Sequence, residues 1–273
     1  MEPILNLKLL PRLSIFLIAC CCFHFAYSES ILIKSIPIDG DFIATDHLRN
    51  CYVITTKNEL IKLNENGTQL YLSSQKKYGK LAFVDANNPL NLLLFYPEFS
   101  TILSLDKTLS EIGSYDLGQL NINRISTIAR SSDNKIWIYD LDNYRLKKID
   151  ETLSLIVQSD NLNVLLNHTF IPNSMLENNH YVYLNDSTQG ILVFDTYGTY
   201  SKTIPIKGLT SFQIIEDQLV YFLKGELKAY NLKTFMEQTI LLPNVQNILN
   251  VKIEKERLYI LSKGQLDIYK MQF

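Results

Sequence analysis

The 273-residue chain carries a formal net charge of −2, and 47% of its residues are hydrophobic and 20% charged. This balance is that of an ordinary globular domain with enough apolar material for a core. Because nucleic-acid binding calls for a clustered basic face, which this slightly acidic chain lacks, we expect no nucleic-acid partner.

The first 28 residues have the pattern of an export signal. Lys8 and Arg12 precede an apolar run at residues 13–26, which is short for a membrane span but has the length of a secretory hydrophobic region. The sequence Ala26-Tyr27-Ser28 fits the small-x-small rule for signal peptidase. We therefore predict a signal peptide over residues 1–28 and export to the periplasm or the extracellular space.

The same segment has a second interpretation. Leu17-Ile18-Ala19-Cys20 resembles the lipobox of bacterial lipoproteins, so that residues 1–19 would be the leader and Cys20 a lipidated first residue. The protein would then be an outer-membrane lipoprotein that contacts the membrane only through its lipid anchor. An uncleaved signal anchor is the third alternative, and the sequence leaves all three open.

Cysteine usage indicates a domain held together by packing. Three of the four cysteines lie in the leader, so cleavage after Ser28 leaves Cys51 alone and no intramolecular disulfide can form. Cys51 begins the apolar stretch Cys51-Tyr52-Val53-Ile54. We predict that its side chain is buried and packs as a small hydrophobic residue.

Four short strand patterns follow, with turn signals between them. They cover residues 42–45, 52–55, 60–63 and 70–72. The second pattern recurs along the chain as a run that is apolar on both faces, which is typical of sheets sandwiched between two neighbours.

The end of the third strand recurs six times as one phrase: an aliphatic residue, two variable residues, a bulky apolar residue, then Asp, Asn or Lys. The last positions are Asn64, Asp106, Asp150, Asp195, Asn231 and Lys270, at intervals of 36 to 45 residues. This is the period of four-stranded propeller blades, and the terminal Asp or Asn can start a turn by bonding the backbone two residues on. We predict an all-β six-bladed β-propeller of four-stranded antiparallel blades over residues 31–273.

The two ends of the chain predict how the ring closes. Residues 34–40 (KSIPIDG) match residues 202–208 (KTIPIKG), which lie in an expected outer strand, whereas the sixth repeat ends at Phe273 before its own outer strand. Proline suits an edge strand. We therefore predict that the segment around Ile36 supplies the outer strand of the last blade.

Two connections are candidates for function. Residues 159–172 form the longest interruption between repeats, and their asparagines and His168 could line a binding surface, although a loop without regular structure is the simpler expectation. Asp140-Leu141-Asp142-Asn143 faintly resembles a calcium loop but lacks the glycine and distal glutamate of an EF-hand. For this cluster we predict a solvated hairpin turn.

Polar residues near the ends of the expected inner strands are candidates for a ligand site at the mouth of the central channel. They are Asp46, His47, Asp85, Arg130 and Lys252. Convergence of these side chains would form a mixed-charge pocket, but we favour a channel wall in which they pair with one another. The histidines after the leader fall in separate repeats without metal-ligand spacing, and no catalytic motif is present, so we predict no metal and no cofactor.

The layout of the repeats, best seen in residues 133–140 (DNKIWIYD) and 145–150 (RLKKID), resembles the NHL-like six-bladed propellers of bacterial envelopes. The resemblance covers roughly residues 31–273 and concerns the fold. It implies an architecture that supports binding, scaffolding, lactone hydrolysis and lyase chemistry alike.

We favour a monomeric, non-enzymatic cell-envelope propeller that binds or scaffolds a protein or glycan partner on one face of the disc. The alternative is a propeller hydrolase or lyase with a divalent metal at the channel mouth, which needs at least three ligands about 2.0–2.6 Å from a common point. The chain has 16 Tyr and 13 Phe. An exposed patch of these aromatic residues would favour the binding protein.

Overall fold

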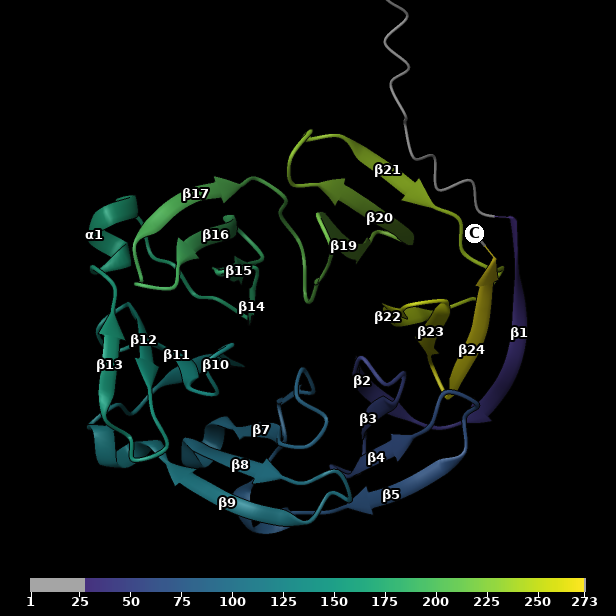
Figure 1. The fold of residues 1–273 in the computed structure, drawn as a ribbon, viewed down its shortest axis with the longest axis horizontal. Coiled ribbons are helices and arrows are strands. Elements are labelled where there is room, and N and C mark those ends of the chain that lie inside the picture. The colour runs from purple at the N-terminus through teal and green to yellow at the C-terminus, as the bar shows by residue number, and fades with distance from the viewer. Residues whose placement is uncertain (1–27, 273) are drawn as a thin grey trace, which may run out of the picture.

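The computed structural model describes residues 28–272, which form six four-stranded antiparallel sheets arranged around a central axis (Figure 1). The predicted six-bladed β-propeller is confirmed. Each sheet is one blade, and its first strand lies nearest the axis and its last strand at the rim.

In blades 1 to 5 the four strands follow one another along the chain. Blade 1 contains β2 (Gly40–Thr45), β3 (Cys51–Thr55), β4 (Leu60–Leu63) and β5 (Gln69–Ser73). Blade 2 contains β6 (Phe83–Asp85), β7 (Leu92–Tyr96), β8 (Thr101–Leu105) and β9 (Glu111–Asp116). Blade 3 contains β10 (Ile125–Arg130), β11 (Ile136–Asp140), β12 (Arg145–Ile149) and β13 (Leu155–Gln158).

The second half of the chain repeats this arrangement. Blade 4 contains β14 (Ser174–Asn178), β15 (Tyr181–Asp186), β16 (Gly190–Asp195) and β17 (Tyr200–Ile204). Blade 5 contains β18 (Gln213–Ile215), β19 (Gln218–Leu223), β20 (Glu226–Asn231) and β21 (Glu237–Ile240). Blade 6 contains β22 (Ile248–Glu254), β23 (Arg257–Ser262), β24 (Gln265–Gln272) and β1 (Ser28–Pro37). The short helices η1 (Lys76–Tyr78), η2 (Pro97–Phe99), η3 (Leu117–Leu120) and α1 (Leu162–Leu166) lie in connections.

Closure of the ring follows the predicted route. The N-terminal strand β1 pairs with β24 at the rim of blade 6, and Ile36 lies opposite Leu266 (Figure 1). The side chain of Ile36 also packs on the cluster between blades 6 and 1. The first strand of the described chain therefore completes the last sheet and covers the outer edge of β24.

Apolar contacts between neighbouring blades form the core. In the described chain these contacts gather into six clusters, one at each blade junction. Tyr52 faces blade 2, whereas the next residue, Val53, faces blade 6. Because adjacent strand residues point to opposite faces, a strand between two blades must be apolar throughout, as its sequence is.

The repeated Asp or Asn at the end of each third strand has the predicted mechanical role. Asp106 Oδ1 accepts hydrogen bonds from the backbone N–H groups of Thr108 (2.8 Å) and Ser110 (3.0 Å). Asp150 and Asp195 bind the equivalent backbone groups of their own turns. The side chain thus fixes the turn between the third and fourth strands.

The connection at residues 159–172 is more ordered than expected. The prediction of a loop without regular structure is wrong for Leu162–Leu166, which form the single-turn helix α1. Asn161 caps this helix by accepting a hydrogen bond from Val164 N (3.1 Å), and Leu162 and Phe170 are buried in the cluster between blades 3 and 4. Two buried side chains and one capping residue are too few to produce the periodic apolar pattern by which a helix is predicted from sequence.

Cys51 is fully buried in the cluster between blades 6 and 1, as predicted. Burial raises the pKa of its thiol, so the thiol stays protonated. The predicted signal peptide, with its alternative lipidation site at Cys20, lies almost wholly outside the described residues. Within residues 28–272, no helix has the length and apolar character needed to cross a membrane.

Candidate functional site

The two surfaces of the disc differ in which turns they carry. Because neighbouring strands are antiparallel, the turns between first and second strands and those between third and fourth strands lie at the same end of each blade. We call the surface that carries these turns the mouth face. The connections between blades lie on the opposite face.

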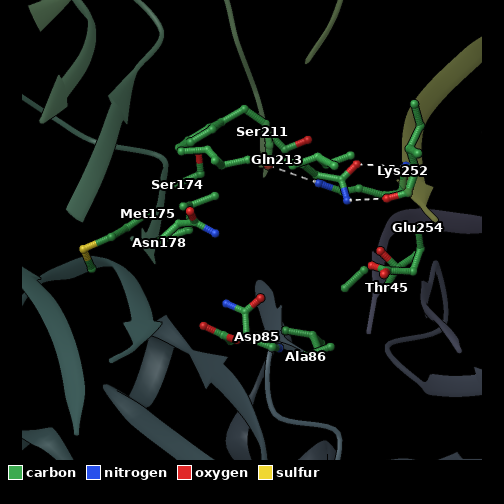
Figure 2. Close-up of a pocket in the computed structure, with 18 of the residues that line it drawn as sticks. Thr45, Asp85, Ala86, Ser174, Met175, Asn178, Ser211, Gln213, Lys252 and Glu254 are labelled. Atoms are coloured by element: carbon green, nitrogen blue, oxygen red, sulfur yellow. Dashed lines mark hydrogen bonds between the residues drawn. The ribbon is translucent and has the colours of Figure 1, made fainter. Parts of the chain in front are cut away.

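A cavity of about 250 Å³ lies among the first strands, at the centre of the disc. Residues from β2, β6, β14, β18 and β22 line it, and several lie where those strands end toward the mouth face (Figure 2). The cavity is therefore the mouth of the central channel.

Asp85 is one of two sequence candidates that line this cavity. Its carboxylate is buried and accepts hydrogen bonds from the backbone N–H groups of Arg130 (2.7 Å) and Asn87 (2.9 Å). Burial raises the pKa of Asp85, and these two hydrogen bonds only partly oppose the shift. The side chain ties β6 to β10, which is the wall role favoured from the sequence.

Lys252 is the second candidate on the cavity wall. Its ammonium group lies 5.5 Å from the centre of the Phe42 ring and 3.5 Å from the carbonyl oxygen of Phe212. Burial lowers the pKa of Lys252 to about 8. The cavity thus holds a cation that is only weakly compensated by protein acceptors.

The other three candidates do not line the cavity. Asp46 is buried in its own turn, where it accepts hydrogen bonds from Asn50 Nδ2 (2.8 Å) and Tyr52 OH (2.7 Å). His47 is exposed in that turn. Arg130 points toward blade 2 and donates from Nη2 to Asn91 Oδ1 (2.8 Å).

Glu254 is a cavity residue that the sequence analysis missed. Within the described part of the chain its carboxylate has no hydrogen-bond or ion-pair partner, and burial raises its pKa to about 7. Glu254 and Lys252 are two residues apart on β22, so they share a strand face. Its place two residues after the candidate Lys252 in the same strand is the sequence feature that could have identified it.

Amide side chains complete the wall. Gln213 donates from Nε2 to the carbonyl oxygen of Ile253 (3.0 Å) and accepts from Ile253 N (2.9 Å), which joins β18 to β22 (Figure 2). Asn178 also lines the cavity, and its Oδ1 atom is buried without a partner in residues 28–272. The cavity therefore offers a cation, a carboxylate and an amide oxygen, a set suited to binding a polar group.

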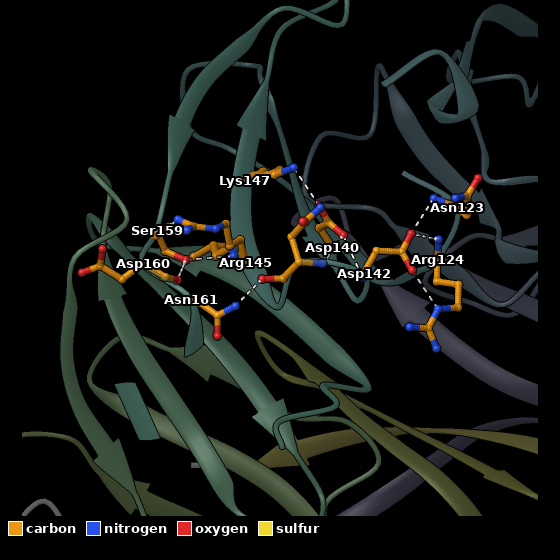
Figure 3. Close-up of polar contacts among 11 residues, drawn as sticks. Asn123, Arg124, Asp140, Asp142, Arg145, Lys147, Ser159, Asp160 and Asn161 are labelled. Atoms are coloured by element: carbon orange, nitrogen blue, oxygen red, sulfur yellow. Dashed lines mark hydrogen bonds and ion pairs between the residues drawn. The ribbon is translucent and has the colours of Figure 1, made fainter. Parts of the chain in front are cut away.

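The acidic cluster at Asp140 is a hairpin turn between β11 and β12, as predicted, but the prediction that it is solvated is wrong for Asp140, which is fully buried. Asp140 accepts hydrogen bonds from Lys147 Nζ (2.7 Å) and Asn143 Nδ2 (2.8 Å), and Asp142 Oδ1 accepts from Arg124 Nε (2.9 Å) (Figure 3). Burial works to raise the pKa of Asp140, but the hydrogen bonds from Lys147 and Asn143 outweigh it and hold that pKa below its usual value. Protein donors therefore occupy these carboxylates.

No three His, Cys, Asp or Glu side chains lie close enough to share a metal ion in the region from residue 28 to residue 272. The cavity carboxylates Asp85, Glu177 and Glu254 belong to three different blades. Asp85 is already bonded to backbone N–H groups, and Glu177 accepts hydrogen bonds from Ser132 N and Trp137 Nε1. The channel mouth thus offers charged and amide groups without a described three-ligand set.

Large apolar side chains are exposed on the mouth face of blades 4 and 5. They are Tyr181, Tyr197, Phe235 and Met236, and we call them the aromatic patch. Tyr197 is 80% exposed in the turn between β16 and β17, and Phe235 is 63% exposed in the turn between β20 and β21. The ammonium group of Lys202 lies 5.6 Å from the Phe235 ring centre, which links the two blades.

Fold and site define a six-bladed β-propeller with a polar channel mouth and an aromatic patch beside it. No model of a known protein family matches the chain, and no curated protein matches its sequence. Solved structures of similar fold include virginiamycin B lyase from Staphylococcus aureus, with 10% identity, a TM-score of 0.64, and coverage of 89% of this chain and 99% of the lyase.

Two further solved structures also have a similar fold. BBS1N in complex with ARL6DN has 10% identity and a TM-score of 0.60, with coverage of 90% of this chain and 98% of the other. BamB from Moraxella catarrhalis has 14% identity and a TM-score of 0.51, with coverage of 89% and 98%. At these identities the similarity shows the fold, which is shared by an enzyme and by a member of a protein complex.

Proposed function

We propose that the protein is an exported, non-enzymatic propeller that binds a protein partner on its mouth face. The observation that carries this proposal is the aromatic patch. Four large apolar side chains are exposed at turns of blades 4 and 5 on that face, whereas the other exposed aromatic side chains in residues 28–272, Phe99 and Tyr71, lie in the β7–β8 connection and on the rim strand β5. Exposed Tyr, Phe and Met side chains that gather on one face are typical of protein interfaces.

The patch has the form of a recognition site. Tyr197 and Phe235 stand on turns whose backbones are fixed by Asp195 and Asn231, so little order is lost when a partner binds. Lys202, Lys233 and Asp217 lie beside Tyr181, and the ammonium group of Lys202 also lies 5.6 Å from the centre of the Phe235 ring. Lys233 Nζ and Asp217 Oδ2 are 2.6 Å apart. An apolar centre with a charged rim is the usual anatomy of an interface.

Export rests on the leader pattern. Cleavage after Ser28 would release a propeller that begins close to β1, whereas lipidation at Cys20 would leave a short tether between the membrane and the rim of blade 6. In both cases the leader joins the domain at Ser28, on the rim strand of blade 6, and not on blades 4 and 5, which carry the aromatic patch. The complex of BBS1N with ARL6DN is consistent with a protein partner for this fold.

Quantitative capture from a cell-envelope extract tests this proposal. The bait is the exported protein, compared with a Tyr197→Ser, Phe235→Ser double variant. The matched control is Val164→Ser with Leu241→Ser, because these residues are 80% and 69% exposed but lie in connections on the opposite face. We expect a discrete protein that wild type and control retain equally and the patch variant retains at least about tenfold less.

Two results would contradict the proposal. Equal retention by the patch variant would show that the mouth-face aromatics are not the binding surface. Recovery of a glycan in place of a protein, with the same dependence on Tyr197 and Phe235, would replace the proposed partner class.

A further inference from the structure

A second cavity, of about 380 Å³, lies between blades 5 and 6. Its apolar wall includes Val220, Ala229 and Ile240 from blade 5 and Ile253 from blade 6. It shares Ile215, Ile253 and Lys255 with the channel-mouth cavity, so the mouth gives access to it. The cluster at this junction is also less completely buried than those of the opposite blades, where most members are fully buried.

The register of the blades explains why space is left there. In each blade one residue of the second strand faces the next blade and pairs with the third residue of the repeated phrase. The six pairs are Tyr52 with Lys62, Leu93 with Ser104, Trp137 with Lys148, Tyr183 with Val193, Val220 with Ala229 and Tyr259 with Ile268. Four pairs contain an aromatic ring, whereas blade 5 has Val220 and Ala229.

Blade 2 also lacks the ring, but another side chain occupies that junction. Arg130 of blade 3 reaches back and donates from Nη2 to Asn91 Oδ1, and Asn91 also accepts a hydrogen bond from Ser104. At the junction of blades 5 and 6 the corresponding volume remains a cavity. The junction of blades 5 and 6 therefore contains a space where four other junctions hold an aromatic side chain.

Two of the four rings also carry a donor that reaches the next blade. Trp137 Nε1 donates to Glu177 Oε2 (2.5 Å), and Tyr259 OH donates to the carbonyl oxygen of Arg49 (2.6 Å). In the cavity between blades 5 and 6, Gln218 Oε1 is a buried acceptor without a partner among residues 28–272. A buried acceptor of this kind costs free energy until a donor meets it.

We propose that this cavity binds a small aromatic molecule that carries a ring N–H or O–H group, of the indole or phenol class. The apolar walls favour the ring, Gln218 favours the donor, and the volume lies within the range of small-ligand sites. Apolar cavity walls in proteins bind single aromatic rings readily, and here Glu216, Gln238, Lys255 and Glu256 add polar groups to the lining. The site is separate from the aromatic patch and does not depend on a protein partner.

Ligand-detected NMR with indole and p-cresol as probes tests the proposal on the full exported chain. Wild type is compared with Val220→Trp, which places the chain's own ring in the cavity. A second variant, Ala229→Met, fills it with a smaller change. Val164→Trp is the control, since it adds an indole at an exposed site of α1 on the other side of the disc.

We expect saturable binding of indole to wild type and control with a dissociation constant of about 1 mM or tighter, and at least a tenfold loss in a folded filling variant. Val220→Trp or Ala229→Met should also raise the melting temperature. Absence of saturable binding to wild type would overturn the proposal, as would undiminished binding by both filled variants. Equal affinity for cyclohexanol would overturn the assignment to aromatic donors.

Discussion

Closure by β1 makes a quantitative prediction at Ile36. Its side chain packs on Leu266 and Ile268 and lies against the β4–β5 turn, where a Cβ atom added at Gly67 would approach Ile36 Cδ1 to 2.8 Å. The neighbouring Ser35 Oγ donates to Asp267 Oδ1 (2.5 Å). Truncating a fully buried Ile to Ala costs about 2–5 kcal/mol, so the half-buried Ile36 should lose about 1–2 kcal/mol on Ile36→Ala.

The assay uses the single tryptophan as a remote reporter. Trp137 is fully buried in blade 3, across the disc from β1 (Figure 1). In a closed ring that unfolds cooperatively, Ile36→Ala should lower the urea midpoint of Trp137 fluorescence and of far-ultraviolet circular dichroism by the same amount. Leu32→Ala, at a half-exposed residue of the same strand, should change stability by less than about 0.5 kcal/mol. An unchanged Trp137 midpoint in Ile36→Ala would refute the coupling of β1 to the whole ring.

Three further changes test the channel mouth. Burial raises the folded pKa of Glu254 from 4.5 to about 7. The folded state therefore binds more protons than the unfolded state between these values, and the free energy of unfolding falls as pH rises through this window. In urea titrations Glu254→Gln should abolish this fall and, allowing for partial exposure, should be about 1–2 kcal/mol more stable than wild type at pH 8. Burial lowers the folded pKa of Lys252 from 10.5 to about 8, so wild-type stability should rise with pH between those values. Lys252→Met should lack this rise and be about 1–3 kcal/mol more stable than wild type at pH 7. A pH profile of the variant that runs parallel to that of wild type would contradict this expectation. Gln213→Leu removes both hydrogen bonds to Ile253 and should cost about 1–3 kcal/mol of stability, measured by thermal unfolding. Gln213→Glu should also be less stable than wild type, because a carboxylate can accept from Ile253 N but cannot donate to its carbonyl oxygen.

The architecture was predictable because the residues that determine it recur from blade to blade and act on near neighbours in the chain. The third strands of blades 1 to 5 end in a side chain such as Asp106 that binds its own turn, and second strands are apolar on both faces, as at Tyr52 and Val53. These are contacts between residues close in sequence or in neighbouring blades. The match of residues 34–40 with residues 202–208 predicted closure because both segments include the end of a rim strand, β1 and β17.

The site was harder to predict because it depends on contacts across the disc. Asp85 and Lys252 line the cavity, but Arg130, at a similar place in its blade, turns away to Asn91. Glu254 was missed because a glutamate at a strand end usually faces solvent. The short helix α1 was missed because burial of Leu162 and Phe170 between blades, and no periodic pattern, holds it in place.

The proposed binding function requires a protein partner in contact with the mouth-face aromatics of blades 4 and 5. Site-specific photo-crosslinking in intact cells tests it most directly, with a photoreactive amino acid placed at Tyr197 and, separately, at Val164 on the opposite face. We predict one discrete crosslinked protein of higher mass from position 197 that is absent from position 164. The same adducts from both positions, or none from position 197, would contradict a mouth-face binding function.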